Sequence, residues 1–288
     1  MIKNPPEYQD YHNFLALNVV TPFYDKRLAE LKKMSLGGVL KSKNPYMLKA
    51  KGLATPHDLV RAVVDAFLSS QEETMFGNLL ENFAVYVSSR LDGGFKPQGR
   101  PSIDLEFERA GRYHIVSIKS GTNWGNSDQI NGMKNNFKAA KAALRESGVA
   151  KEIVAVNGCI YGREPRPLKD KKRVRVAGKL VVLDEEADKV YYKYAGQAFW
   201  HFISGDDSLY QEIIRPIDKE ARLRNETFTK TYTGKINEMA LEFGQHFLDA
   251  EGQIDWIKLI DYVSQREAPA LSLSGGRRAA ARKSFNPS

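Results

Sequence analysis

The chain has 288 residues, with 43 Lys and Arg against 35 Asp and Glu, so its formal net charge is +8 and its isoelectric point is about 9.3. A hydrophobic content of 42% and a charged content of 27% are typical of one large or two small globular domains and argue against wholesale disorder. The single cysteine, Cys159, excludes an internal disulfide and a cysteine-rich zinc site. No apolar run reaches the roughly 18 residues needed to span a bilayer. We therefore expect a cytoplasmic protein without a membrane segment.

The positive charge is clustered along the chain. Residues 26–51 contain eight basic residues and one acid, residues 163–179 contain eight basic residues and two acids, and residues 275–288 contain four basic residues and no acid. Such patches neutralise phosphates and release counterions, so nucleic acid is the first hypothesis for a partner. The alternative is an ordinary solvated surface followed by a basic tail.

The N-terminal part of the chain predicts helices. The first 40 residues are expected to form an extension with one short helix around 24–33, ended by Gly37-Gly38. Thr55 as N-cap and Pro56 in the first turn then predict the start of a longer helix.

A second long helix is expected over about 71–89. Ser70 followed three residues later by Glu73 has the pattern of a capping box, which marks a helix start. The glycines and proline of residues 90–100 predict a loop after it.

The middle of the chain predicts an α/β core. Residues 102–108 alternate apolar and acidic side chains, which indicates a half-buried strand, and residues 113–119 are apolar on both faces, which indicates a central strand. A third helix, with Ser127 as its cap, follows a tight loop. Further segments predict a strand at 152–161, a strand pair formed by 174–182 and 189–194, a core helix at 196–203 and helices from 218 onward. Together these elements predict a mixed central sheet flanked by helices, with additional helices at both ends.

The turn at Ala110-Gly111 fixes which residues of the first two strands face each other. A hairpin loop of two or four residues places Asp104 across from Ser117 and makes Lys119 its diagonal neighbour, roughly 7–8 Å away on the same face. A loop of odd length would move Lys119 to the opposite face.

A carboxylate and an ammonium at one end of a sheet suit phosphodiester hydrolysis. A divalent metal held by carboxylates neutralises the phosphate and activates water, and Mg²⁺ needs only one or two protein carboxylates. A nearby lysine orients the water or stabilises developing negative charge. The alternative is that Asp104, Glu106 and Glu108 form a solvated strand face and that Lys119 ends its strand in water.

The second metal carboxylate is open at this point. Glu81 lies at the edge of an apolar helix face, where a carboxylate needs a partner, either a metal or an interfacial salt bridge. Glu106 shares the face of Asp104 and is the backup ligand. The candidate DNA-binding residues are a basic stripe on the third helix and two residues of the loop before it: Lys134, Lys138, Lys141, Asn123 and Asn126.

An acid on one strand and a lysine on the next, flanked by helices, resemble the PD-(D/E)XK nuclease superfamily. More narrowly, the chain from about 43 to 217 resembles type II restriction endonucleases of the PmeII-like group. The resemblance is carried by Lys43-Asn44-Pro45-Tyr46, Glu72–Gly77, Asp104–Phe107, Ser117–Gly121, Asn123–Asn126, Gly196–Trp200 and Leu209-Tyr210.

The resemblance implies a restriction-endonuclease-like core and Mg²⁺-dependent hydrolysis of both strands of a short DNA site, leaving 5′-phosphate and 3′-hydroxyl ends. It makes Asp104 the metal acid and Lys119 the motif lysine. Ser117 stands where the superfamily usually has its second acid, and Glu81 on the neighbouring helix is then the replacement.

We expect a homodimer, because a two-fold protein matches a palindromic site. The expected organisation is an N-terminal helical extension, a nuclease core, a C-terminal helical region and a basic disordered tail, over 1–42, 43–217, 218–272 and 273–288. The rival hypotheses are a DNA-binding protein without cleavage activity on the same fold and a repair or structure-selective nuclease.

Overall fold

A computed structural model describes residues 8–163, 173–176, 179–182 and 191–265. The chain forms two compact units, and each is built from two separate segments of sequence. Unit 1 comprises Met1–Asp25 and Glu72–Asn225, and unit 2 comprises Lys26–Gln71 and Glu226–Ser288. The predicted organisation consists instead of four consecutive ranges. The tail at 273–288 lies outside the described residues.

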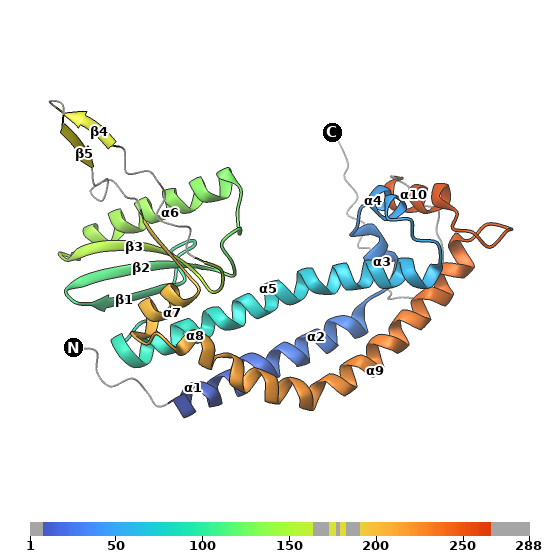
Figure 1. Cartoon of the computed structure of the whole chain (residues 1–288), viewed down its shortest axis with the longest axis horizontal. Helices are drawn as coiled ribbons and strands as arrows, with labels where there is room; N and C mark the ends of the chain where they lie inside the picture. Colours follow the sequence, from blue (N-terminus) through green and yellow to red (C-terminus); the bar gives the residue numbers. More distant parts are fainter. Residues whose placement is uncertain (1–7, 164–172, 177–178, 183–190, 266–288) are drawn as a thin grey trace, which may run out of the picture. The chain divides into compact units, whose positions relative to one another are not determined.

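Unit 1 contains the predicted mixed sheet (Figure 1). Its strands are β1 (Leu105–Arg109), β2 (Arg112–Lys119), β3 (Glu152–Cys159) and β6 (Tyr192–Ala195), in the order β1-β2-β3-β6. The pair β1–β2 is antiparallel, whereas β2–β3 and β3–β6 are parallel. The strand that is apolar on both faces, β2, is therefore central as predicted.

The predicted pairing of 174–182 with 189–194 is wrong. Strands β4 (Arg173–Val176) and β5 (Lys179–Val182) pair with each other as a separate antiparallel ribbon, while β6 pairs with β3. Only two residues separate β4 from β5 in the sequence, which favours a local hairpin. Strand β6 satisfies the backbone groups that β3 would otherwise leave unpaired at the sheet edge.

The predicted hairpin register is confirmed. Leu105 pairs with Val116 and Arg109 with Arg112, so paired residue numbers sum to 221 as expected. The pairing ends at Leu105, and the Asp104 N–H donates to the carbonyl of Val116, not of Ser117, so the predicted pair of Asp104 with Ser117 is not formed. The turn has two residues, Ala110 and Gly111, with φ angles of 50° and 77°. Positive φ at both positions is the conformation whose twist matches that of the flanking strands.

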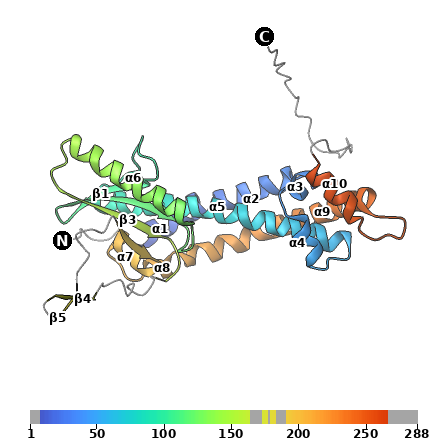
Figure 2. The same cartoon turned by 90° about the horizontal axis from the view of Figure 1, so that it is seen from above.

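Helices cover both faces of the sheet in unit 1 (Figure 2). On one face lies α6 (Ser127–Glu146), which buries Met133, Phe137, Ala140 and Leu144 against the sheet. On the other face lie the C-terminal half of α5 (Pro56–Asp92) and α7 (Gln197–Ser204), which is followed by the short α8 (Leu209–Glu212). The fully buried Phe83 of α5 and Trp200 of α7 are part of this second layer.

Helix α5 is one continuous helix of 37 residues, so the predicted break at Ser70 is wrong. Thr55 caps its start as predicted, accepting the Asp58 N–H at 3.1 Å. The Ser70 hydroxyl donates to the Ala66 carbonyl, four residues earlier, at 3.0 Å. A serine can satisfy its hydroxyl in this way inside a helix, so the capping-box pattern did not start a new one.

The N-terminal region is more helical than predicted. It forms α1 (Tyr8–Phe14), a π-helical turn η1 (Leu15–Val20) and α2 (Thr21–Lys33) in direct succession. Tyr11, Leu15 and Val19, spaced four apart, are buried in the core of unit 1. The two glycines at 37 and 38 lie inside α3 (Leu36–Lys41), which Ser35 caps, and do not end a helix.

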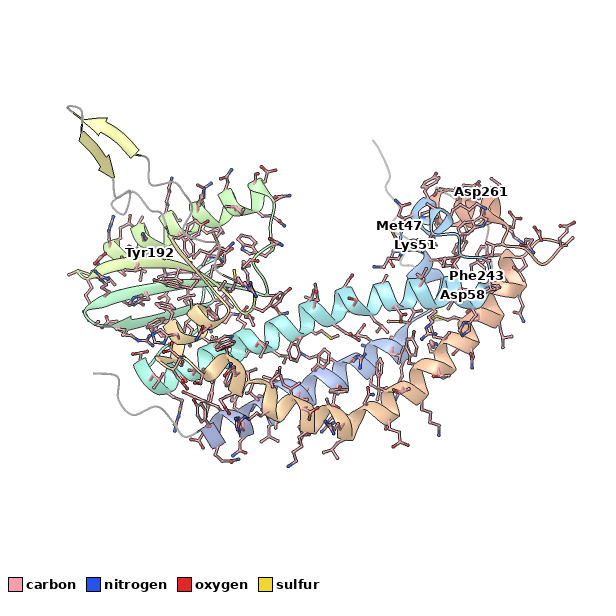
Figure 3. The ribbon with its side chains drawn as sticks, in the orientation of Figure 1. Met47, Lys51, Asp58, Tyr192, Phe243 and Asp261 are labelled. Atoms are coloured by element: carbon pink, nitrogen blue, oxygen red, sulfur yellow. The ribbon has the colours of Figure 1, made fainter. Side chains whose placement is uncertain are left out.

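Unit 2 is helical in the residues that the structure describes. Helix α10 (Trp256–Ser264) contacts α3 and α4 (Pro45–Ala50), and α9 (Ile214–Phe247) supplies aromatic side chains to the core. One of them is the fully buried Phe243, labelled in Figure 3. The predicted helices beyond residue 218 are thus confirmed. Among the described helices, none combines the length and apolar character needed to cross a membrane.

Candidate active site

Asp104 and Lys119 converge at one end of the β1–β2 hairpin. The Nζ atom of Lys119 lies 3.8 Å from Oδ2 of Asp104, and both side chains are partly buried, with 26% and 16% of their surface exposed. The predicted proximity of the two side chains is therefore confirmed. Their catalytic roles stay a prediction.

The position of Asp104 follows from the way β1 begins. The Asp104 N–H donates to the Val116 carbonyl at 2.8 Å, but the chain turns away before this residue, where Ser102 has a φ of 61°. The next donor along β2, the Ile118 N–H, is instead accepted by Oδ2 of Asp104 at 2.7 Å. The carboxylate thus takes the place of a backbone acceptor and is held at the end of the ladder.

Lys119 is held by its own strand and by the loop that follows. Its Nζ atom donates to the Ile118 carbonyl at 3.0 Å and lies 5.5 Å from the centroid of the Trp124 ring, within the range of a cation–π interaction. The Trp124 ring is fixed in turn, because its Nε1 donates to Oδ1 of Asn157 on β3 at 3.2 Å.

Glu81 of α5 reaches the same region. It lines a cavity of about 240 Å³ together with Lys119, Ser120 and Ile118, among others. The Nζ atom of Lys96 donates to Oε1 of Glu81 at 2.6 Å. Burial raises the pKa of Glu81, the negative charge of Asp104 raises it further, and the neighbouring lysines oppose this shift. The ion-pair partner anticipated for Glu81 is therefore present, and the charge of Asp104 acts on the same carboxylate.

Glu106 is not brought into this cavity. Its side chain is fully buried, and both oxygens are bonded to Nη1 of Arg100, at 2.8 and 2.9 Å. The Tyr113 hydroxyl donates to the same carboxylate at 2.7 Å. The interpretation of the acidic residues of β1 as one solvated face is therefore wrong for Glu106. To bind a metal ion as the backup ligand, Glu106 would have to lose its hydrogen bonds with Arg100 and Tyr113.

Ser117, at the position of the usual second acid, is also fully buried. Within the described residues its hydroxyl has no hydrogen-bond partner. An uncharged, enclosed hydroxyl does not replace a metal-binding carboxylate.

The candidate DNA-binding residues differ in their surroundings. Lys134 and Lys141 of α6 are partly buried, while Lys138 of the same helix and Asn123 of the preceding loop are exposed. Burial and the positive charge of Arg145 lower the pKa of Lys141, and Glu152 opposes them.

Asn126 is occupied as the N-cap of α6. Its side chain accepts the Gln129 N–H at 3.0 Å, and the Gln129 side chain accepts the Asn126 N–H at 3.0 Å. The predicted cap, Ser127, is instead the first helical residue. Asn126 is the stronger cap because its partner three residues on can complete a reciprocal capping box.

Lys96 is the site residue that sequence reasoning missed. It lies in the Gly- and Pro-containing loop between α5 and β1, which has no periodicity that would indicate where its side chains point. Two features of the sequence could have pointed to Lys96. The loop joins the helix that carries Glu81 to the strand that follows Asp104, and Lys96 is the only lysine in this loop.

The donors present fit a hard divalent cation. No group of three or more His, Cys, Asp or Glu residues able to hold a metal occurs in the described part of the chain. Glu81 nevertheless lines the cavity together with Lys119, and Asp104 supplies a second carboxylate 3.8 Å from the Lys119 amine. Mg²⁺ takes oxygen ligands, retains several waters and is commonly held by one or two carboxylates.

Comparison with known families places the chain in the class of type II restriction endonucleases. A family model described as "Type II restriction endonuclease EcoO109I" matches residues 10–225, which is more than half of the chain. The chain therefore belongs to the EcoO109I family. The match includes Glu81, Asp104 and Lys119, and it extends N-terminally beyond the 43–217 range of the resemblance. No curated protein matches the chain.

Proposed function

We propose that this chain is a Mg²⁺-dependent restriction enzyme that hydrolyses both strands of a short site in double-stranded DNA, leaving 5′-phosphate and 3′-hydroxyl ends. Membership of a type II restriction endonuclease family supports the reaction class. The observation that carries the choice of site is the approach of Lys119 to Asp104, 3.8 Å apart and beside a cavity that Glu81 also lines.

In this proposal Asp104 and Glu81 hold the metal ion. When bound, Mg²⁺ neutralises charge on the scissile phosphate and lowers the pKa of a water molecule. Asp104 is suited to this role because the Ile118 N–H fixes its carboxylate before any ligand arrives. A preorganised ligand loses little freedom on binding.

Lys119 acts on the water and the phosphate. Its ammonium is a strong donor in a partly buried position, where electrostatic interactions are less screened than in bulk water. We propose that it orients the attacking water and stabilises the negative charge that develops on the phosphate oxygens. The contact with Trp124 keeps the amine at the end of the strand.

The site is proposed to be a PD-(D/E)XK variant of the PmeII-like kind. Ser117 occupies the place of the second acid, and Glu81 from α5 supplies the missing carboxylate. The support for this substitution is that Glu81 lines the cavity together with Lys119 and that its pKa responds to the charge of Asp104.

For DNA contacts we propose Lys134, Lys138 and Lys141 of α6, with Asn123 of the preceding loop. Lysines bind phosphates without regard to sequence, so these residues position DNA and do not by themselves select a site. We further propose that the enzyme acts as a homodimer, since cutting two strands of a palindrome calls for two active sites related by a two-fold axis. Sedimentation of the full chain with and without DNA measures this.

The experiment that tests the function is incubation of the full chain with plasmid and Mg²⁺. Discrete bands whose sequenced ends share one motif are expected. Smearing or nicking would instead indicate a structure-selective nuclease, and DNA binding without cleavage would indicate a non-catalytic binding protein.

A matched pair of lysine variants tests the site. Lys119→Met should lose cleavage and keep DNA affinity. Lys151→Met should cut like the wild type, because Lys151 pairs with the exposed Glu108 near the other end of β1. Equal activity in the two variants would refute the assignment of Lys119.

A further inference from the structure

We propose that Lys96 is an internal counter-ion of Glu81 that a divalent cation has to displace, so that Lys96 sets the metal affinity of the DNA-free enzyme. This inference rests on the proposed role of Glu81 as a metal ligand. Its structural basis is the direct bond between the two residues, in which Lys96 Nζ lies 2.6 Å from Glu81 Oε1.

The loop backbone holds Lys96 in this position. Phe95, the residue before it, exchanges two backbone hydrogen bonds with Glu106 of β1, at 2.9 and 2.8 Å. The Gly94 N–H donates to the Ser88 carbonyl of α5 at 3.2 Å. The loop is thereby attached to α5, which carries Glu81, and to β1, which follows Asp104. These backbone bonds fix the part of the loop from which the Lys96 side chain reaches Glu81.

The two partners differ in exposure in a way that suits exchange. The side chain of Glu81 is 15% exposed, whereas that of Lys96 is 55% exposed. A largely exposed ammonium regains its hydration easily when it leaves, so its departure costs little free energy. The largely buried carboxylate, by contrast, is destabilised in its charged form when it lacks a positive partner.

The balance of charges also indicates that Lys96 leaves when a divalent cation binds. Two carboxylates, Asp104 and Glu81, face two ammonium groups, Lys119 and Lys96, so the metal-free group is neutral. Adding a divalent cation without releasing a lysine would place an excess of two positive charges in a partly enclosed site. Lys96 is the more exposed of the two lysines and therefore the one expected to leave.

The test measures metal binding directly. Mg²⁺ is titrated calorimetrically, without DNA, into the full-length wild type and into the Lys96→Met, Lys151→Met and Glu81→Gln variants. Lys96→Met should bind Mg²⁺ about two- to fivefold more tightly, the range expected for release of an exposed ion pair. Lys151→Met removes the same charge from a distant ion pair and should match the wild type.

A second readout follows the lysine itself. Acylation of Lys96 by an amine-reactive reagent, measured by mass spectrometry relative to Lys151, should become faster when Mg²⁺ is added. Unchanged affinity in Lys96→Met, or unchanged acylation, would overturn the inference. Undiminished Mg²⁺ binding in Glu81→Gln would overturn Glu81 as a ligand, so failure of the proposed function is distinguishable from failure of this inference.

Discussion

The carboxylate of Asp104 completes the β1–β2 ladder by accepting the N–H of Ile118 at 2.7 Å. The same oxygen, Oδ2, lies 3.8 Å from Nζ of Lys119. One side chain therefore both ends a strand pair and supplies charge to the candidate site, and these two contributions can be separated by substitution.

Two substitutions of Asp104 separate its structural contribution from its charge. Asp104→Asn keeps an oxygen acceptor for Ile118 but removes the charge, so cleavage should fall by about 10²-fold or more while the melting temperature stays near the wild-type value. Asp104→Ala also leaves the buried Ile118 N–H unpaired, at a cost of about 1–3 kcal/mol in unfolding free energy. Cleavage assays and urea denaturation measure the two effects. Full activity in Asp104→Asn would exclude a charge-dependent role.

Glu106 is expected to matter for stability rather than for metal binding. Glu106→Ala leaves Arg100 and the Tyr113 hydroxyl without their buried partner, which should lower the unfolding free energy by about 3 kcal/mol. The matched variant is Glu108→Ala on the same strand, whose exposed ion pair with Lys151 should contribute less than about 1 kcal/mol. Denaturant titration compares them. Similar losses in both variants would contradict the importance of the buried network.

Asn126 should behave as a helix cap. Asn126→Ala removes the capping box of α6 and should cost about 1 kcal/mol. Asn123→Ala, at an exposed position in the same loop, should leave the thermal stability unchanged and weaken DNA binding if the proposed contact exists. Calorimetry and a DNA-binding titration distinguish the two. A stability loss confined to Asn123→Ala would reverse the assignment.

The hairpin turn can be improved. Ala110 has a φ of 50°, which is costly for a residue with a Cβ, and it precedes Gly111 with a φ of 77°. Ala110→Asn creates the Asn-Gly pair favoured in this turn and should raise the unfolding free energy by about 1 kcal/mol. Gly111→Ala should lower it by a similar amount. Thermal melts of both variants give the sign directly, and a destabilised Ala110→Asn would disprove the argument.

His114 should make the protein less stable in mild acid. Burial, followed by the positive charges of Arg109 and Arg112, lowers its pKa from 6.5 to about 4. Between these two pH values the unfolded chain binds a proton that the folded protein does not, so stability falls as the pH drops from about 6.5 to about 4. The contribution is on the order of 3 kcal/mol.

His114→Phe tests this dependence, because His114 already stacks on Phe107 with the ring centroids 4.8 Å apart. The variant should lose less stability than the wild type between pH 7 and pH 4.5, as measured by urea denaturation at each pH. An equal loss in the two proteins would rule out His114 as the source.

Local rules were sufficient for several parts of the fold. Turn chemistry at Ala110-Gly111 and strand alternation predicted the register that brings Asp104 and Lys119 together, and both features act over a few neighbouring residues. Local rules failed where a pattern was compatible with two structures. A serine hydroxyl can be satisfied inside a continuous helix as well as at a cap, and in α5 Ser70 bonds the Ala66 carbonyl within the helix.

The amino-acid sequence by itself determined the mixed sheet, its central strand and the meeting of an acid with a lysine, because short-range hydrogen bonding and hydrophobic periodicity specify them. Tertiary structure alone decided that Glu81 binds Lys96 and that Glu106 is enclosed by Arg100 and Tyr113. These carboxylates look alike in the sequence. Their partners and their burial depend on which side chains of other segments approach them, and residue spacing does not encode this.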